Sequence, residues 1–287
     1  MKREIDMLNG SLWDKILIFA IPLAVTAILQ QVFNAADIAV VGRFVSADAM
    51  AAVGSNGALV GLMINLFVGI SLGTNVVIAQ YIGHGDREGI RRAISTSIVA
   101  AFVGGFLFLG LGEVIAVPML KLLAVPAEIF DMTLLYLRIY FLGMPVIFLY
   151  NVEAAIFRSH GDTRTPMIVL MIAGVINVAL NLFLVCVVGM TVEGVAIATV
   201  VSNLFSAFVL FVLLCRSTGD VRIDPKDLKF DRREFSRIVR IGVPSGIQGM
   251  VFSIANLCIQ SGINSLGATV MAASAAALNI EIVAFSC

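Results

Sequence analysis

The sequence predicts an all-α protein that crosses a membrane several times. Of its 287 residues, 60% are hydrophobic and 13% are charged, and the mean hydropathy is +1.01. Soluble domains carry about 25% charged residues, so this composition indicates a lipid environment. Apolar runs long enough to span a bilayer, which takes about 20 residues, recur along the chain between short charged or Gly- and Pro-containing breaks.

Seven spans are expected, and an eighth begins near Ala268. The seven cover residues 16–42, 52–82, 93–117, 132–157, 166–190, 192–215 and 241–266. The first run is longer than the apolar core of a signal peptide, and another span follows it closely. No cleaved signal peptide is therefore expected.

The distribution of Lys and Arg predicts that the N-terminus is cytoplasmic. Alternate connections hold 16 of the 19 basic residues, eight of them between Arg216 and Arg240. The opposite connections hold only Arg43 and Lys121, and Arg138 lies within the fourth span. The net charge of zero argues against a nucleic-acid partner. Membrane lipid is the expected surrounding partner.

The chain contains an internal repeat. The aromatic–basic–aliphatic–proline order of residues 13–22 recurs in residues 235–244, 222 residues later. Six spans, an even number, separate the copies, so both enter from the same side, as in transporters built from parallel repeats. We expect a six-helix N-lobe (1–215), a solvated cytoplasmic connector (216–240) and the start of a C-lobe (241–287) in a molecule of twelve helices.

Asp37 is an acid inside the first span, and no basic residue lies between Lys15 and Arg43. It is five residues from Gly42, roughly 7 Å from the outer end of the span at 1.5 Å per residue. Ionisable groups in a membrane are costly and usually face a cavity or a partner. The alternative is that Asp37 reaches toward the outer interface, which suits its short side chain less well than Lys or Arg.

Three neutral polar residues are predicted to lie at a similar depth. Asn177 and Asn181 are spaced i, i+4 and share one helix face. A short link at 189–191 makes the fifth and sixth spans an antiparallel hairpin, which brings Thr199 level with them. Carboxylate, amide and hydroxyl oxygens suit Na⁺, and a carboxylate alone can take a proton. The alternative is that Asn and Thr only bridge helices.

Four other acids lie in or near the spans. Glu113, Glu153 and Glu193 are close to span ends, and we expect them at the membrane interface. Glu281 lies within the eighth span and is an additional candidate for a cation site.

No motif indicates catalysis or a resident metal. The sequence contains no HExxH motif and no Walker loop, and its four cysteines show no CxxC spacing. We expect no enzymatic activity, no cofactor, and no metal other than Na⁺ at the cation site. Residues 84–86 and 160–162 both read His-Gly-Asp, which is typical of a turn whose Asp caps the next helix, rather than of a two-histidine metal site.

Several motifs together resemble the multidrug and toxic compound extrusion (MATE) family over essentially the whole chain. They are Pro22, Gln30, Gln31, Asn34, Asp37 and 41–43 with 51–54 in the first two spans, and later 79–86, 157–166, 194–199 and 241–246. The bacterial branches are the most similar, which implies a location in the bacterial cytoplasmic membrane.

This resemblance implies two six-helix lobes that rock around a central cavity and export organic cations and other drugs in exchange for H⁺ or Na⁺. It implies that Asp37 is the cation-responsive residue, and that Asn177, Asn181 and Thr199 help to form an N-lobe cation site. Asn34 is an additional candidate. We expect a monomer.

Two departures from the family pattern bear on this site. Several members carry an aspartate at the position of Asn181, so the choice between H⁺ and Na⁺ stays open. Another branch carries a glutamate at the position of Phe252, so a C-lobe cation site of that type is not expected.

Three alternatives to drug export remain. A flippase for lipid-linked sugars would need several basic residues along its cavity, and Arg138 is the one basic residue within the spans. A membrane receptor or scaffold would not transport. The third alternative is a non-transporting fragment, because one lobe and part of another form no alternating pair.

Overall fold

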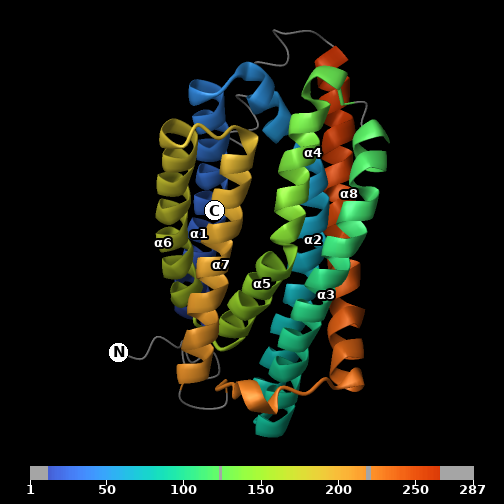
Figure 1. The fold of residues 1–287 in the computed structure, drawn as a ribbon. Coiled ribbons are helices and arrows are strands. Elements are labelled where there is room, and N and C mark those ends of the chain that lie inside the picture. Colours follow the sequence, from blue (N-terminus) through green and yellow to red (C-terminus); the bar gives the residue numbers. More distant parts are fainter. Residues whose placement is uncertain (1–11, 123–124, 218–220, 266–287) are drawn as a thin grey trace.

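The computed structural model describes residues 12–122, 125–217 and 221–265, and every regular element in these ranges is a helix (Figure 1). In chain order these are α1 Leu12–Phe44, α2 Ala47–His84, α3 Arg87–Leu122, α4 Ala127–Leu142, α5 Met144–Ser159, α6 Arg164–Leu182, η1 Phe183–Val187, α7 Val192–Arg216, η2 Pro225–Asp227 and α8 Arg232–Ser265. Within the described ranges, six helical spans are long and apolar enough to cross a membrane, and the bent pair α4–α5 makes a seventh. The multi-pass all-α fold is therefore confirmed.

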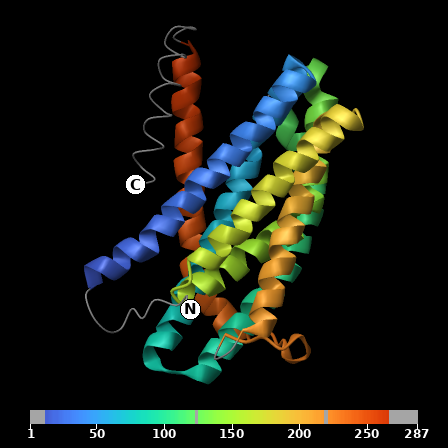
Figure 2. The same ribbon diagram turned by 90° about the vertical axis from the view of Figure 1, so that its left-hand side faces the viewer.

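The helices form two groups, with α5 crossing between them (Figure 1). α6 packs against both α1 and α7, while α2 packs against α3, α4 and α8. Seen from the side, α1 runs obliquely to the nearly upright α8 (Figure 2). The loops 85–86 and 160–163 lie at the same end as the segment 221–231; we call this the connector end.

The fourth span is bent, whereas the sequence predicted one continuous helix over 132–157. α4 and α5 meet at Gly143 with an angle of 50° between them. Pro145 lies in the first turn of α5. Proline lacks an N–H and clashes with the preceding turn, so the helix cannot continue through this point.

The seventh span begins earlier than expected. α8 starts at Arg232, so the last nine residues of the predicted connector are helical. Asp231 initiates this helix, because its Oδ1 accepts a hydrogen bond from the backbone N–H of Arg233 at 2.7 Å. A side-chain oxygen at this position satisfies an N–H group that the first helical turn leaves free.

The connector was expected to be solvated, but its described part is docked on the bundle. Val221 and Ile223 are buried. The hydroxyl of Ser95 on α3 accepts from the N–H of Lys229 at 2.5 Å and donates to its carbonyl at 2.9 Å. Residues 221–231 therefore lie across the connector end, and we call this segment the strap.

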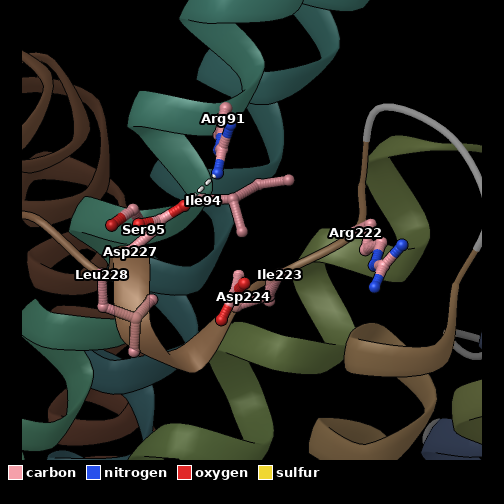
Figure 3. A pocket seen from close by; sticks show the side chains of 8 residues that line it. All are labelled: Arg91, Ile94, Ser95, Arg222, Ile223, Asp224, Asp227 and Leu228. Atoms are coloured by element: carbon pink, nitrogen blue, oxygen red, sulfur yellow. Dashed lines mark hydrogen bonds and ion pairs between the residues drawn. The ribbon is translucent and has the colours of Figure 1, made fainter.

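Figure 3 shows the seam between this strap and α3. Arg91 reaches Asp227 at 2.6 Å, and Ile94 and Leu228 lie beside this ion pair. Both charged side chains are more than half exposed, and an exposed pair contributes at most about 1 kcal/mol. The strap is therefore held mainly by the two hydrogen bonds between the Ser95 hydroxyl and the backbone of Lys229, together with its buried aliphatic side chains.

α2 and α8 approach closely through glycines. A Cβ atom on Gly69 would lie 2.3 Å from the backbone nitrogen of Gly246, and one on Gly73 would lie 2.3 Å from the carbonyl oxygen of Ile238. Small residues allow the backbones of membrane helices to pack this tightly. One turn along, Asn65 donates to the hydroxyl of Ser253 at 2.8 Å.

The two His-Gly-Asp turns are confirmed. Gly85 and Gly161 have φ angles of 69° and 80°, a region that L-residues rarely adopt. Asp86 accepts from the N–H of Gly89 at 2.9 Å, and Asp162 accepts from the N–H of Thr165 at 2.9 Å.

The predicted eighth span, with Glu281, lies outside the described residues. The twelve-helix organisation and the parallel repeat therefore stay predictions.

Candidate functional site

Asp37, Asn177, Asn181 and Thr199 lie together in one hydrogen-bonded cluster between α1, α6 and α7. The amide nitrogen of Asn181 donates to Oδ1 of Asp37 at 2.5 Å, and the Thr199 hydroxyl lies 3.3 Å from Oδ2. Asn177 links the two neutral partners, because it donates to Thr199 Oγ1 at 3.3 Å and accepts from Asn181 at 3.2 Å. The common depth expected from the sequence agrees with these contacts.

The cluster is buried and rich in acceptor oxygens. Asp37 is 8% exposed and Asn181 is fully buried. Among the described residues, Oδ1 of Asn181 has no hydrogen-bond donor. Buried polar atoms normally have a partner, so this free oxygen next to a carboxylate can accept a bond from a proton carrier or coordinate a small cation.

Local irregularities position these side chains. α6 changes into the π-helix η1 immediately after Leu182, and such insertions often occur at functional sites. One turn before Asn177, Gly174 gives room to an aromatic ring of α1: a Cβ there would lie 1.8 Å from Cζ of Phe33. α1 and α6 can thereby approach closely enough for Asp37 to reach Asn181.

The cluster borders a cavity of about 440 Å³ between the two helix groups. Polar side chains from all sides line it: Gln30, Gln31, Asn34, Asp37, Asn65, Asn151, Asn177, Thr199, Ser202, Asn203 and Ser206. Phe33, Tyr140 and Tyr150 contribute aromatic surface. Asp37 is the only Asp, Glu, Lys or Arg among the lining residues.

Most of this lining was not predicted from the sequence. Tyr140 on α4 lines the cavity, and both Tyr136 and Tyr140 lie within electrostatic range of Asp37, although the sequence of their span does not indicate it. A detectable signal existed on α7, where Ser202 and Ser206 repeat the i, i+4 spacing used for Asn177 and Asn181.

The interfacial prediction for Glu153 was wrong. Its side chain is fully buried on α5, because α5 is inclined across the bundle rather than running along its edge (Figure 1). Glu113 instead pairs with Arg138 of the neighbouring span at 3.4 Å, with both side chains partly exposed.

The comparison with known proteins decides the family, since the model of the MatE family matches residues 22–183, more than half of the chain. The chain belongs to the MATE family. The matched region contains Asp37, Asn177 and Asn181.

Two curated proteins are similar to most of this chain. The probable multidrug resistance protein YoeA of Bacillus subtilis is 30% identical over 92% of this chain, and the probable multidrug resistance protein NorM of Thermotoga maritima is 28% identical over 93%. The chain spans 58% of the length of each.

Solved structures agree on the fold. A MATE crystal structure in a bent conformation superposes with a TM-score of 0.90 at 24% identity, covering 100% of this chain and 64% of that one. An outward-facing MATE transporter gives a TM-score of 0.87 at 23% identity, covering 96% of this chain and 62% of that one.

Proposed function

We propose that this lobe belongs to a cation-coupled multidrug antiporter, which exports organic cations and other xenobiotics in exchange for H⁺ or Na⁺ by alternating access. One observation carries the proposal: Asp37 is the single acid in a polar and aromatic cavity large enough for part of a drug molecule. The relatives named as multidrug resistance proteins support it. We further propose that the connector end faces the cytoplasm of a bacterial cell.

The coupling follows from competition for one negative charge. A drug cation, a proton and Na⁺ can each neutralise Asp37, and not all at once. If the inward- and outward-facing states differ in their affinity for the coupling ion, binding of that ion shifts their populations. Tyr140, Tyr150 and Phe33 offer aromatic faces that attract organic cations.

The oxygens of the cluster fit either coupling ion. Asp37 supplies two carboxylate oxygens, and Asn177, Asn181 and Thr199 supply neutral oxygens, which are the hard ligands that such cations prefer. A proton needs only the carboxylate, and Asn181 and Thr199 then hold its orientation.

The lining disfavours the flippase alternative. A lipid-linked sugar carries a pyrophosphate, which basic side chains recognise. Neither Lys nor Arg lines the described cavity.

The test is drug export by the complete transporter carrying Asp37→Asn, which keeps the shape but removes the charge. We expect normal insertion and loss of drug resistance. Asp48→Asn is the matched control, because Asp48 is exposed at the start of α2 and its loss should leave export unchanged. Export by Asp37→Asn at the parental rate and expression level would refute the coupling role.

Asn181→Ala and Thr199→Ala should weaken coupling less than Asp37→Asn. Each removes one neutral partner but leaves the carboxylate in place. Dose–response curves for drug resistance should therefore fall between those of the parent and Asp37→Asn, and a complete loss in either variant would contradict this ranking.

A further inference from the structure

Glu153 is a buried acid on α5 that does not belong to the Asp37 site. Ile147, Tyr150 and Asn151 of α5 line the Asp37 cavity. Leu149, which precedes Glu153 by four residues and shares its helix face, instead lines a separate groove. Glu153 itself lines neither the cavity nor the groove.

This groove is apolar and faces α3 and α7. It has a volume of about 380 Å³, and Phe102, Leu149, Phe211 and Leu228 are among its lining residues. Leu228 belongs to the strap at the connector end. Glu153 lies six residues before the end of α5 at Ser159, or about 9 Å from that end.

The structure shows no partner for the carboxyl group of Glu153 within the ranges that it describes. The side chain is fully buried, and neither oxygen has a hydrogen-bond partner among the described residues. Arg158, the nearest basic residue on α5, donates to the carbonyl of Ala154 at 3.1 Å and interacts with Tyr150. Among the described residues it forms no ion pair with Glu153.

Within the part of the chain that the structure describes, no basic side chain on the helices packed against α5 forms an ion pair with Glu153. On α7 the titratable neighbour of Glu153 is Cys215, which also interacts with Asp224 and Arg222 of the strap. On α2, Asn75 donates to the carbonyl of Ala155.

Two arginines of α3, Arg91 and Arg92, are paired with other acids. Arg91 pairs with Asp227, and Arg92 pairs with Glu88 at 2.9 Å and lies 3.9 Å from Glu234. A charged carboxylate without a partner is strongly unfavourable in such surroundings.

We propose that Glu153 is a second proton-binding site of this lobe, at the connector end and independent of Asp37. In the present conformation the carboxyl group holds its proton. When a conformational change brings water to this end of α5, the O–H bond breaks and the proton passes to water, which leaves a hydrated carboxylate. The site would supply protons to the same aqueous phase that the strap faces.

Thermal unfolding of Glu153→Gln tests the protonated state. Glutamine resembles a neutral carboxylic acid in shape, so the complete protein should keep its wild-type Tm to within a few degrees. Glu234→Gln is the matched control, because Glu234 is also buried but accepts from the Tyr81 hydroxyl at 2.7 Å beside Arg92. This control should lower the Tm clearly. An equally large drop for Glu153→Gln would show a charged, partnered Glu153 and overturn the proposal.

Dicyclohexylcarbodiimide gives a second readout that needs no transport activity. This lipid-soluble reagent modifies protonated carboxyl groups, and the apolar groove lined by Leu149, one turn from Glu153, offers it a route. Mass spectrometry of the protein in liposomes should show an adduct on Glu153 that weakens as the pH is raised and is absent from Glu153→Gln. Complete peptide coverage of α5 without this adduct would overturn the proposal, and would leave the role of Asp37 untouched.

Discussion

Replacing Asn181 with aspartate should convert the site into one that requires a bound cation. The amide nitrogen of Asn181 donates to Asp37 at 2.5 Å and to the side-chain oxygen of Asn177 at 3.2 Å. Asn181→Asp replaces this donor with an oxygen, so three acceptors face one another with no hydrogen between them.

The repulsion sets the size of the effect. Two unit charges about 4 Å apart repel by about 4 kcal/mol at an effective dielectric constant of 20. A monovalent cation bound between them removes this cost, which corresponds to roughly a thousandfold gain in its binding constant. A ligand that binds only the folded state raises the apparent stability, so the gain is measurable as a shift in Tm.

The assay is thermal unfolding of the purified protein at mildly alkaline pH, in NaCl and in choline chloride of equal ionic strength. Asn181→Asp should unfold at a clearly higher temperature in NaCl, with a smaller difference in the parent. Asn151→Asp is the matched control, because Asn151 lines the same cavity but bonds to the carbonyl of Ile147 at 2.8 Å rather than to Asp37. The reasoning is refuted if both variants respond equally to Na⁺.

Two further predictions concern the fold. Gly69→Ala should lower the Tm, because its Cβ would meet the backbone of Gly246 and overpacking costs about 1–3 kcal/mol. Gly110→Ala should leave the Tm unchanged, because no atom lies within 4 Å of the new Cβ. Equal effects of the two variants would contradict the close packing of α2 and α8. Ser95→Ala should accelerate tryptic cleavage after Lys229 by roughly tenfold or more, since two hydrogen bonds of about 1 kcal/mol each are lost. An unchanged cleavage rate would mean that contacts other than those of Ser95 hold the strap in place.

The sequence was sufficient to predict the residues of the Asp37 cluster but not the shape of the cavity. Helical spacing places Asn177 and Asn181 on one face, and the short hairpin at Gly189 brings Thr199 to their level. The walls contributed by α2, α4 and α5 depend on how far each helix tilts and bends. The spacing of polar and apolar residues in one span carries no information about the tilt of another span.

The sequence by itself determined that the chain is helical and spans a membrane, because backbone groups in lipid must be hydrogen-bonded within each segment. It also determined the turns at 84–86 and 160–162, since Gly and Asp satisfy local backbone requirements there. Only the tertiary structure decided that Glu153 is buried, that the connector is docked, and that α2 and α8 meet at glycines. These features depend on contacts between residues far apart in the chain, where burial is set by the neighbouring helices rather than by the residue's own position in its span.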